Sequence, residues 1–241
     1  MSGHSKWSTI KRQKSVNDAK RGKIFTRHAH NIALAAREGG GDPNGNPRLA
    51  AAIEMARADS LPKENILRAI KKGTGELNEK MAEEKIYEAY GPAGVAFLVT
   101  TLTDNPNRTT ANIRHFFTKH GGKLAESGSV AFQFQKIGFL EIELKGDREA
   151  AELAAIEAGA LDLENTEGEI LGIKTKAAEL NLVQQKIQAA GYPVKAANLI
   201  FEPQNTIEVT TEAETKKITN LMTELENDED VLEIAHNLRL A

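Results

Sequence analysis

The order of apolar segments over residues 137–203 limits the possible folds of this chain more than any other property of its sequence. Apolar residues alternate with glutamates over residues 140–144, and this period of two predicts a strand with one buried face. Further strands are expected at 161–166, 170–175 and 194–201, and helical periodicity predicts helices at 147–159 and 180–190. The resulting order, β-α-β-β-α-β, is typical of the ferredoxin-like fold.

The segments on either side of this unit are incomplete by themselves. Residues 77–136 contain a buried strand at Val95–Leu102 and a helix that ends near His120, but they lack a closing helix and strand. Residues 204–241 are too short to bury a core of their own. They contain strand-like residues at 207–209 and 231–235 and apolar helix positions between 218 and 225. We therefore predict one discontinuous α+β domain, 77–136 plus 204–241, into which the ferredoxin-like domain, 137–203, is inserted.

Residues 1–76 are predicted to form three short helices. Asp18 is expected to cap the first, which runs to about Glu38 and carries an apolar stripe on one face. That stripe consists of Phe25, Ala29, Ile32 and Ala36. Glycines end the first helix, Asn46 and Pro47 begin the second, and the third lies between Pro62 and Gly73. The chain is thus expected to be an α+β multidomain protein with a helical N-terminal module.

Charge is distributed unevenly along the chain. Residues 1–75 hold 15 basic and 6 acidic side chains, a net charge of +9, whereas residues 131–241 hold 10 basic and 21 acidic, a net charge of −11. This pattern predicts an N-terminal module that binds a polyanion, joined to acidic domains that would repel it and could contact a protein partner instead. A solvated charged face on each domain is the plain alternative.

Basic residues are densest near the N-terminus, together with the only tryptophan of the chain. Lysine and arginine pair with phosphates, and Trp7 can either stack on an unpaired base or anchor the tail to the helices. Other cations fall opposite the apolar stripe of the first helix or on a solvent face of the third. The predicted nucleic-acid contacts in this module are Lys6, Trp7, Lys11, Arg12, Lys14, Lys20, Arg21, Lys23, Arg27, Arg68, Lys71 and Lys72.

The loop Thr103–Thr110 is a further candidate for phosphate binding. Helix N-termini expose unpaired amides and a partial positive charge, so Arg108 at this position could hold a phosphate. Helix capping by Asn107 or Thr109 explains the same residues without a ligand.

Several classes of function lack their sequence signatures. The absence of cysteine excludes disulfides, a thiolate nucleophile and zinc fingers. His28 and His30 lie two residues apart, and His115 and His120 lie five apart, so neither pair has the spacing of a metal clip on a helix. No nucleophile elbow, P-loop or dinucleotide fingerprint is present. We predict no catalytic residue, no metal and no cofactor, with a nuclease and a pure protein adaptor as weaker alternatives.

The ferredoxin-like unit also lacks the aromatic residues by which such folds stack on RNA bases, since none occurs over 170–175. Val130, Phe132 and Phe134 are expected on one strand face, in the core of the other α+β domain. The sequence contains no apolar run long enough for a membrane span, so we expect a cytoplasmic protein without a membrane partner.

Seven short motifs follow one another along the chain: GHSKW at 3–7, DAKRGKIFT at 18–26, GGGDP at 39–43, NPRL at 46–49, PKENI at 62–66, YGPAGVA at 90–96 and TDNPNRT at 103–109. By these motifs, in this order, the sequence resembles, over essentially the whole chain, the YebC/PmpR family, which includes the mitochondrial translational activators of cytochrome oxidase. The similarity begins at residue 2, which leaves no room for a transit peptide and favours a bacterial cytoplasmic member.

The resemblance implies a helical N-terminal domain, two α+β domains and a role in gene regulation through nucleic acid. It implies that the contact residues are Lys6, Trp7, Lys11, Arg12, Lys20, Arg21, Lys23 and Arg27. Pro106 stands where the family often has an arginine, which weakens the case for the loop. We predict a non-enzymatic nucleic-acid-binding regulator, most naturally a DNA-binding transcriptional regulatory protein. The alternative is a ribosome-associated translation factor that contacts ribosomal RNA and relieves stalling at proline-rich stretches.

Overall fold

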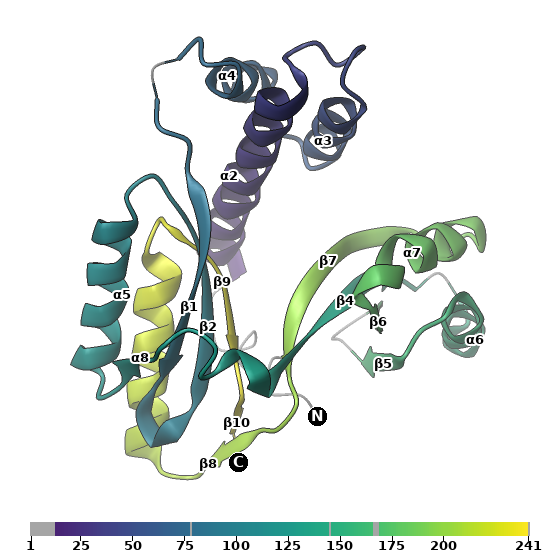
Figure 1. Ribbon diagram of the computed structural model, residues 1–241. Helices are drawn as coiled ribbons and strands as arrows, with labels where there is room; N and C mark the ends of the chain where they lie inside the picture. The colour runs from purple at the N-terminus through teal and green to yellow at the C-terminus, as the bar shows by residue number, and fades with distance from the viewer. Residues whose placement is uncertain (1–12, 78, 145, 166–168, 241) are drawn as a thin grey trace.

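The computed structural model describes residues 13–77, 79–144, 146–165 and 169–240, with the side chains of residues 13–21, 165 and 240 outside the description. Three units are visible in Figure 1: a group of helices, a sheet covered by two helices, and a second sheet covered by two further helices. The predicted α+β multidomain class is confirmed. The exact domain boundaries near residues 76, 136 and 203 stay a prediction.

The helical module consists of α2 (Gln13–Gly39), α3 (Pro47–Ala58) and α4 (Lys63–Gly73). The predicted stripe of α2 packs into its core with residues of the other two helices, including Leu49 and Ile66. The prediction that Asp18 caps α2 is wrong, because the described part of the helix starts at Gln13 and already includes Asp18. No proline or glycine occurs between these two residues, so nothing in the backbone stops the helix from extending.

The predicted boundaries of α3 and α4 are confirmed. Asn46 caps α3, since its side-chain oxygen accepts a hydrogen bond from the Leu49 amide at 3.1 Å. Gly73 ends α4 at a close crossing with α2, where a Cβ atom would lie 2.2 Å from the carbonyl oxygen of Ala33. Only glycine permits this approach of the two backbones.

The central sheet contains β1 (Glu83–Tyr90), β2 (Ala96–Thr103), β3 (Lys123–Leu124) and β9 (Val231–His236) in the order β3-β1-β2-β9. Each neighbouring pair is antiparallel. The helices α5 (Pro106–Lys119) and α8 (Glu212–Asn227) lie side by side on one face (Figure 1). Between the two helices and the sheet lies an apolar core, which contains Phe97 of β2, Phe117 of α5 and Leu221 of α8. Because β9 and α8 come from the C-terminal segment, the ferredoxin-like unit is inserted in this α+β unit, as the predicted fold class requires.

Two short strands complete the C-terminal segment, β8 (Ile207–Val209) and β10 (Leu238–Leu240), which pair in parallel. The sequence predicted β8 but not β10. Three-residue 3₁₀ helices occur at Pro92–Gly94, Ala131–Gln133 and Ala177–Glu179.

The predicted strand through Val130, Phe132 and Phe134 is wrong. The second of the 3₁₀ helices occupies its centre, so alternation is lost and Phe132 is 69% exposed. Val130 and Phe134 are buried on the second face of the central sheet, with Leu98. A period of two places residues on one face only in extended backbone, and the 3₁₀ turn removes that condition.

The inserted unit has the predicted element order: β4 (Phe134–Glu143), α6 (Arg148–Ala158), β5 (Asp162–Asn165), β6 (Ile170–Lys176), α7 (Leu180–Ala189) and β7 (Val194–Pro203). Its strands pair antiparallel in the order β5-β6-β4-β7. This order confirms the ferredoxin-like fold. Asp147 caps α6, and Gly159 ends it in a left-handed conformation with φ of 111°. In the described part of the chain, no helix combines the length and the apolar character that a membrane crossing requires.

Candidate nucleic-acid interface

The predicted contact residues fall into three groups. Lys6, Trp7, Lys11 and Arg12 lie outside the described residues. Lys14, Lys20 and Arg21 belong to α2, but their side chains are not among those described. The side chains of Lys23, Arg27, Arg68, Lys71, Lys72 and Arg108 are described, and the structure places them at three separate positions.

Lys23 and Arg27 lie on the side of α2 that meets the central sheet. The Lys23 ammonium donates a hydrogen bond to the carbonyl oxygen of Glu226, at the end of α8, at 2.9 Å. The Arg27 guanidinium lies 3.5 Å from the Glu233 carboxylate on β9. Burial raises the pKa of Glu233 above its ordinary value, and the positive charge of Arg27 opposes this rise. These two cations therefore connect the helical module to the sheet, rather than forming an open basic face.

Arg68 and Lys72 share one carboxylate on the segment that connects α4 to β1. Arg68 donates to Glu79 at 2.8 Å, and the Lys72 ammonium lies 3.4 Å from the other oxygen of that carboxylate. Bonding to Arg68, followed by Lys72, lowers the pKa of Glu79. Lys71 on the same helix is exposed and makes no ion pair with a described residue. The predicted solvent face of α4 thus offers one unpaired cation and two that are paired.

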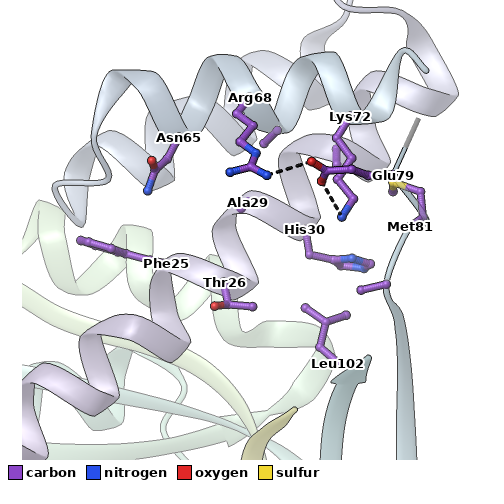
Figure 2. A pocket seen from close by; sticks show the side chains of 13 residues that line it. Phe25, Thr26, Ala29, His30, Asn65, Arg68, Lys72, Glu79, Met81 and Leu102 are labelled. Carbon is purple, nitrogen blue, oxygen red and sulfur yellow. Dashed lines mark hydrogen bonds and ion pairs between the residues drawn. The ribbon is translucent and has the colours of Figure 1, made fainter. Parts of the chain in front are cut away.

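These ion pairs border a cavity of about 360 Å³ between α2, α4 and the connecting segment (Figure 2). Its walls are largely apolar and include Ala29, Met81 and Leu102. His30 and Asn65 add neutral polar groups, since burial lowers the pKa of His30 and favours its uncharged form. The cavity can accept a small, mostly apolar group with a few hydrogen-bonding atoms.

Arg108, at the start of α5, forms ion pairs with two aspartates. Its guanidinium lies 3.0 Å from both carboxylate oxygens of Asp230 and 3.4 Å from Asp104. Asp230 also accepts a hydrogen bond from Thr109 at 2.6 Å. The predicted capping by Asn107 or Thr109 is wrong, because Asn105 is the cap and accepts from the Arg108 amide at 3.3 Å. An arginine already held by two carboxylates is a poor phosphate ligand.

The helical module has further exposed cations outside the predicted set. Arg37, Arg57 and Lys63 are exposed and, like Lys71, form no ion pair with a described residue. They stand at helix ends: Arg37 in the last turn of α2, Arg57 in the last turn of α3 and Lys63 at the start of α4. These three cations differ from the ion-paired cations of the module only in the contacts of the folded structure, and the sequence does not contain that information.

The described side chains contain no cluster of three or more histidines and carboxylates suited to a metal ion. His28 instead lies 2.5 Å from Asp59, at the end of α3, and His120 lies 3.3 Å from Glu224 on α8. Both histidines therefore link secondary structure elements within their own units.

Profiles of known protein families match this chain in two parts, one over the helical module and one over the rest. A profile for the "TACO1/YebC protein N-terminal domain" matches residues 5–76, and one for the "TACO1/YebC second and third domain" matches residues 82–238. The chain belongs to the TACO1/YebC family. The predicted resemblance is thereby confirmed over nearly the full length.

Two relatives of about the same length as this chain have the same name. A "probable transcriptional regulatory protein" of Desulfotalea psychrophila is 48% identical over 98% of this chain and 95% of its own. One of Thermotoga petrophila is 48% identical over 100% of this chain and 94% of its own. The crystal structure of a conserved hypothetical protein from Aquifex aeolicus has a TM-score of 0.83 and 42% identity, with 98% of both chains covered.

Proposed function

We propose that this protein is a non-enzymatic, DNA-binding transcriptional regulatory protein of the cytoplasm, and that its helical module is the part that contacts nucleic acid. The observation that carries this proposal is the net charge of +9 over residues 1–75. Within this segment, Arg37, Arg57, Lys63 and Lys71 are exposed without an ion-pair partner among the described residues. The names of the relatives support a role in transcription.

We assign the contacts to these four cations and to the predicted basic residues between Lys6 and Arg21. Unpaired surface cations can exchange condensed counterions for phosphates without first breaking an intramolecular ion pair. Lys23, Arg27, Arg68, Lys72 and Arg108 would have to break such contacts, so we assign them a smaller contribution.

The test is the salt dependence of binding to a 30-base-pair DNA duplex, measured by fluorescence anisotropy. With about five phosphate contacts, the logarithm of the affinity should fall with the logarithm of salt at a slope of about −4 to −5. The variant Lys63→Glu/Lys71→Glu should lower the affinity about tenfold or more and flatten the slope by about two. A matched control is Lys216→Glu/Lys217→Glu on the exposed side of α8, which should leave both quantities unchanged.

The opposite results would reject the proposal. A salt-independent affinity would exclude phosphate contacts, and equal losses in the two variants would exclude the helical module as the contact surface. The ribosomal alternative would use the same cations, so charge does not separate it. Salt-sensitive co-sedimentation with purified ribosomes, combined with no measurable duplex binding, would replace transcription by translation.

A further inference from the structure

One edge of the central sheet is open along most of β1. On its inner side, β1 pairs with β2 over its full length, from Glu83 to Tyr90. On its outer side, it pairs with β3 only at Ala89 and Tyr90. No other described strand pairs with that side, so residues 83–87 border a place where the sheet could accept another strand.

The direction of the backbone groups along this edge follows from two hydrogen bonds. The Glu88 carbonyl accepts from the Ala125 amide at 2.8 Å, so it points outward, beyond the end of the β3 ladder. The Lys85 carbonyl accepts from the Thr101 hydroxyl at 2.9 Å and points inward, to β2. In an antiparallel sheet, alternate residues direct both the N–H and the C=O to the same side. Glu84 and Ile86 therefore present their backbone donors and acceptors to the open edge.

A hollow of about 530 Å³ accompanies this edge. Lys85 and Tyr87 line it from one face of β1, while Ile86 and Glu88 line it from the other. Side chains of both faces can border one hollow only where it lies along the edge of the strand. Its remaining walls are formed by the segment 123–127 and by Thr110, Arg114 and Thr118 of α5. The Ile86 side chain is 42% exposed.

Three side chains that line the hollow are cations without an ion-pair partner among the described residues. Lys85, Arg114 and Lys123 are exposed and form no ion pair with a described carboxylate. Lys85 lies 5.0 Å from the centre of the Tyr87 ring, which orients its ammonium along the edge. Of the two carboxylates in the lining, Glu88 is occupied by three backbone amides and Glu126 is exposed.

We propose that the outer edge of β1 is a docking site for an extended acidic segment of a partner protein, which adds to the sheet as a further strand. Its backbone would pair with the open groups of Glu84 and Ile86. Its acidic side chains would meet Lys85 and Arg114 on one face, while alternate apolar side chains would cover Ile86 on the other. This site goes beyond the proposed function and does not depend on it.

A peptide fits this edge better than a nucleic acid does. Glu84 and Ile86 each offer an N–H donor and a C=O acceptor at this edge, which matches another strand, whereas phosphate oxygens only accept and would leave the carbonyl groups unpaired. Glu83, Glu84 and Glu126 also lie exposed at the rim and would repel a dense row of phosphates. A peptide can place a glutamate beside each lysine and an uncharged residue beside each glutamate.

The probe is a fluorescein-labelled eight-residue peptide of alternating valine and glutamate, titrated with the full chain and followed by anisotropy. A twin peptide in which lysine replaces glutamate should bind at least about tenfold more weakly. The variant Lys85→Glu/Arg114→Glu/Lys123→Glu should reverse this preference. Lys216→Glu/Lys217→Glu on α8 is the matched control and should change neither affinity by more than about twofold.

The backbone contacts need a separate readout. Peptide binding should slow hydrogen exchange at the amides of Glu84 and Ile86, but not at Lys85 and Tyr87, whose amides face β2. Ile86→Pro removes an outward donor, while Ile86→Thr retains it, so only the proline variant should lose binding. Should the proline variant fail to fold, N-methylation of every second peptide amide removes the partner's donors without altering the protein.

Three results would overturn the proposal: no binding of the acidic peptide at millimolar protein, equal binding of the methylated peptide, or protection at residues other than 84 and 86. Displacement of the peptide by a single-stranded oligonucleotide that depends on Lys85, Arg114 and Lys123, with no protection at the edge amides, would assign the hollow to nucleic acid instead.

Discussion

The guanidinium of Arg27 on α2 lies 3.5 Å from the carboxylate of Glu233 on β9, which joins the helical module to the central sheet. Both side chains are partly exposed, 39% for Arg27 and 27% for Glu233. Lys23 reinforces this junction one turn earlier by its bond to the end of α8. Arg27, which the sequence predicts to contact nucleic acid, thus forms an ion pair within the protein instead.

Reversing the charge of this contact should loosen the junction. Arg27→Glu places a second carboxylate beside Glu233 and is expected to lower the free energy of unfolding by about 1 kcal/mol. The double variant Arg27→Glu/Glu233→Arg should recover most of that loss. Thermal unfolding and protease cleavage of the connecting segment 74–82 measure the effect. Because Arg27 opposes the raised pKa of Glu233, Arg27→Ala should raise that pKa further, and equal pKa values in both proteins would contradict the contact.

Glu88 holds the loop that precedes β4. It is 8% exposed and accepts hydrogen bonds from the amides of Gly128, Val130 and Ala131 at 2.5, 2.6 and 2.7 Å. Glu88→Gln leaves some of these buried amides unpaired and should lower the free energy of unfolding by about 1–3 kcal/mol in chemical denaturation. Glu126→Gln, at an exposed side chain of the same loop, should change it by less than about 0.5 kcal/mol.

The effect of Glu88 should depend on pH with a definite sign. Burial raises its pKa, but the three amides outweigh this and leave the pKa below the ordinary value of 4.5. A lowered pKa in the folded state means that the stabilisation is fully present above about pH 4.5 and is lost as the pH falls through the folded value. The stability difference between the native protein and Glu88→Gln should therefore shrink on acidification. A difference that stays constant down to pH 3 would be inconsistent with this role.

Asp230 connects the start of α5 to the start of β9. It accepts from Thr109 at 2.6 Å and from Arg108 at 3.0 Å, and the Thr103 hydroxyl lies at 3.4 Å. Asp230→Ala leaves the buried threonine hydroxyls short of a partner and should cost about 2 kcal/mol of unfolding free energy. Asp104→Ala removes only the exposed partner of Arg108 and should cost less than about 0.5 kcal/mol. Similar losses in both variants would contradict the special role of the buried threonine contacts of Asp230.

Phe132 and Phe134 provide a direct test of the 3₁₀ turn between the two α+β units. Phe132 is 69% exposed and Phe134 is 6% exposed. Phe132→Ser should change the unfolding free energy by less than about 0.5 kcal/mol, whereas Phe134→Ser should lower it by about 3 kcal/mol. Urea titrations of the two variants make the comparison. Equal losses would restore the continuous strand that the sequence predicts.

Much of the fold could be predicted because its determinants are local. Asn46, Asp147 and Gly159 mark helix ends by their own side chains or by the lack of one. The element order over 137–203 was enough to predict the ferredoxin-like fold, since few arrangements of that order bury all its apolar faces. The extension of α2 upstream of Asp18 and the turn at Phe132 could not be predicted, because backbone that can continue as a helix or a strand gives no local signal of where it stops.

The candidate site divides in the same way. The sequence alone determined that the N-terminal module is strongly basic, since net charge is a sum that does not depend on folding. Only the tertiary structure decided which cations remain unpaired, because ion pairs form between residues distant in the chain, as between Arg27 and Glu233. It likewise decided that the outer edge of β1 is open, because strand pairing is a relation between segments. Composition and local sequence pattern thus determine the helices and strands and the net charge. The exposure of a charged side chain or a strand edge depends instead on which segments pack against it in the folded protein.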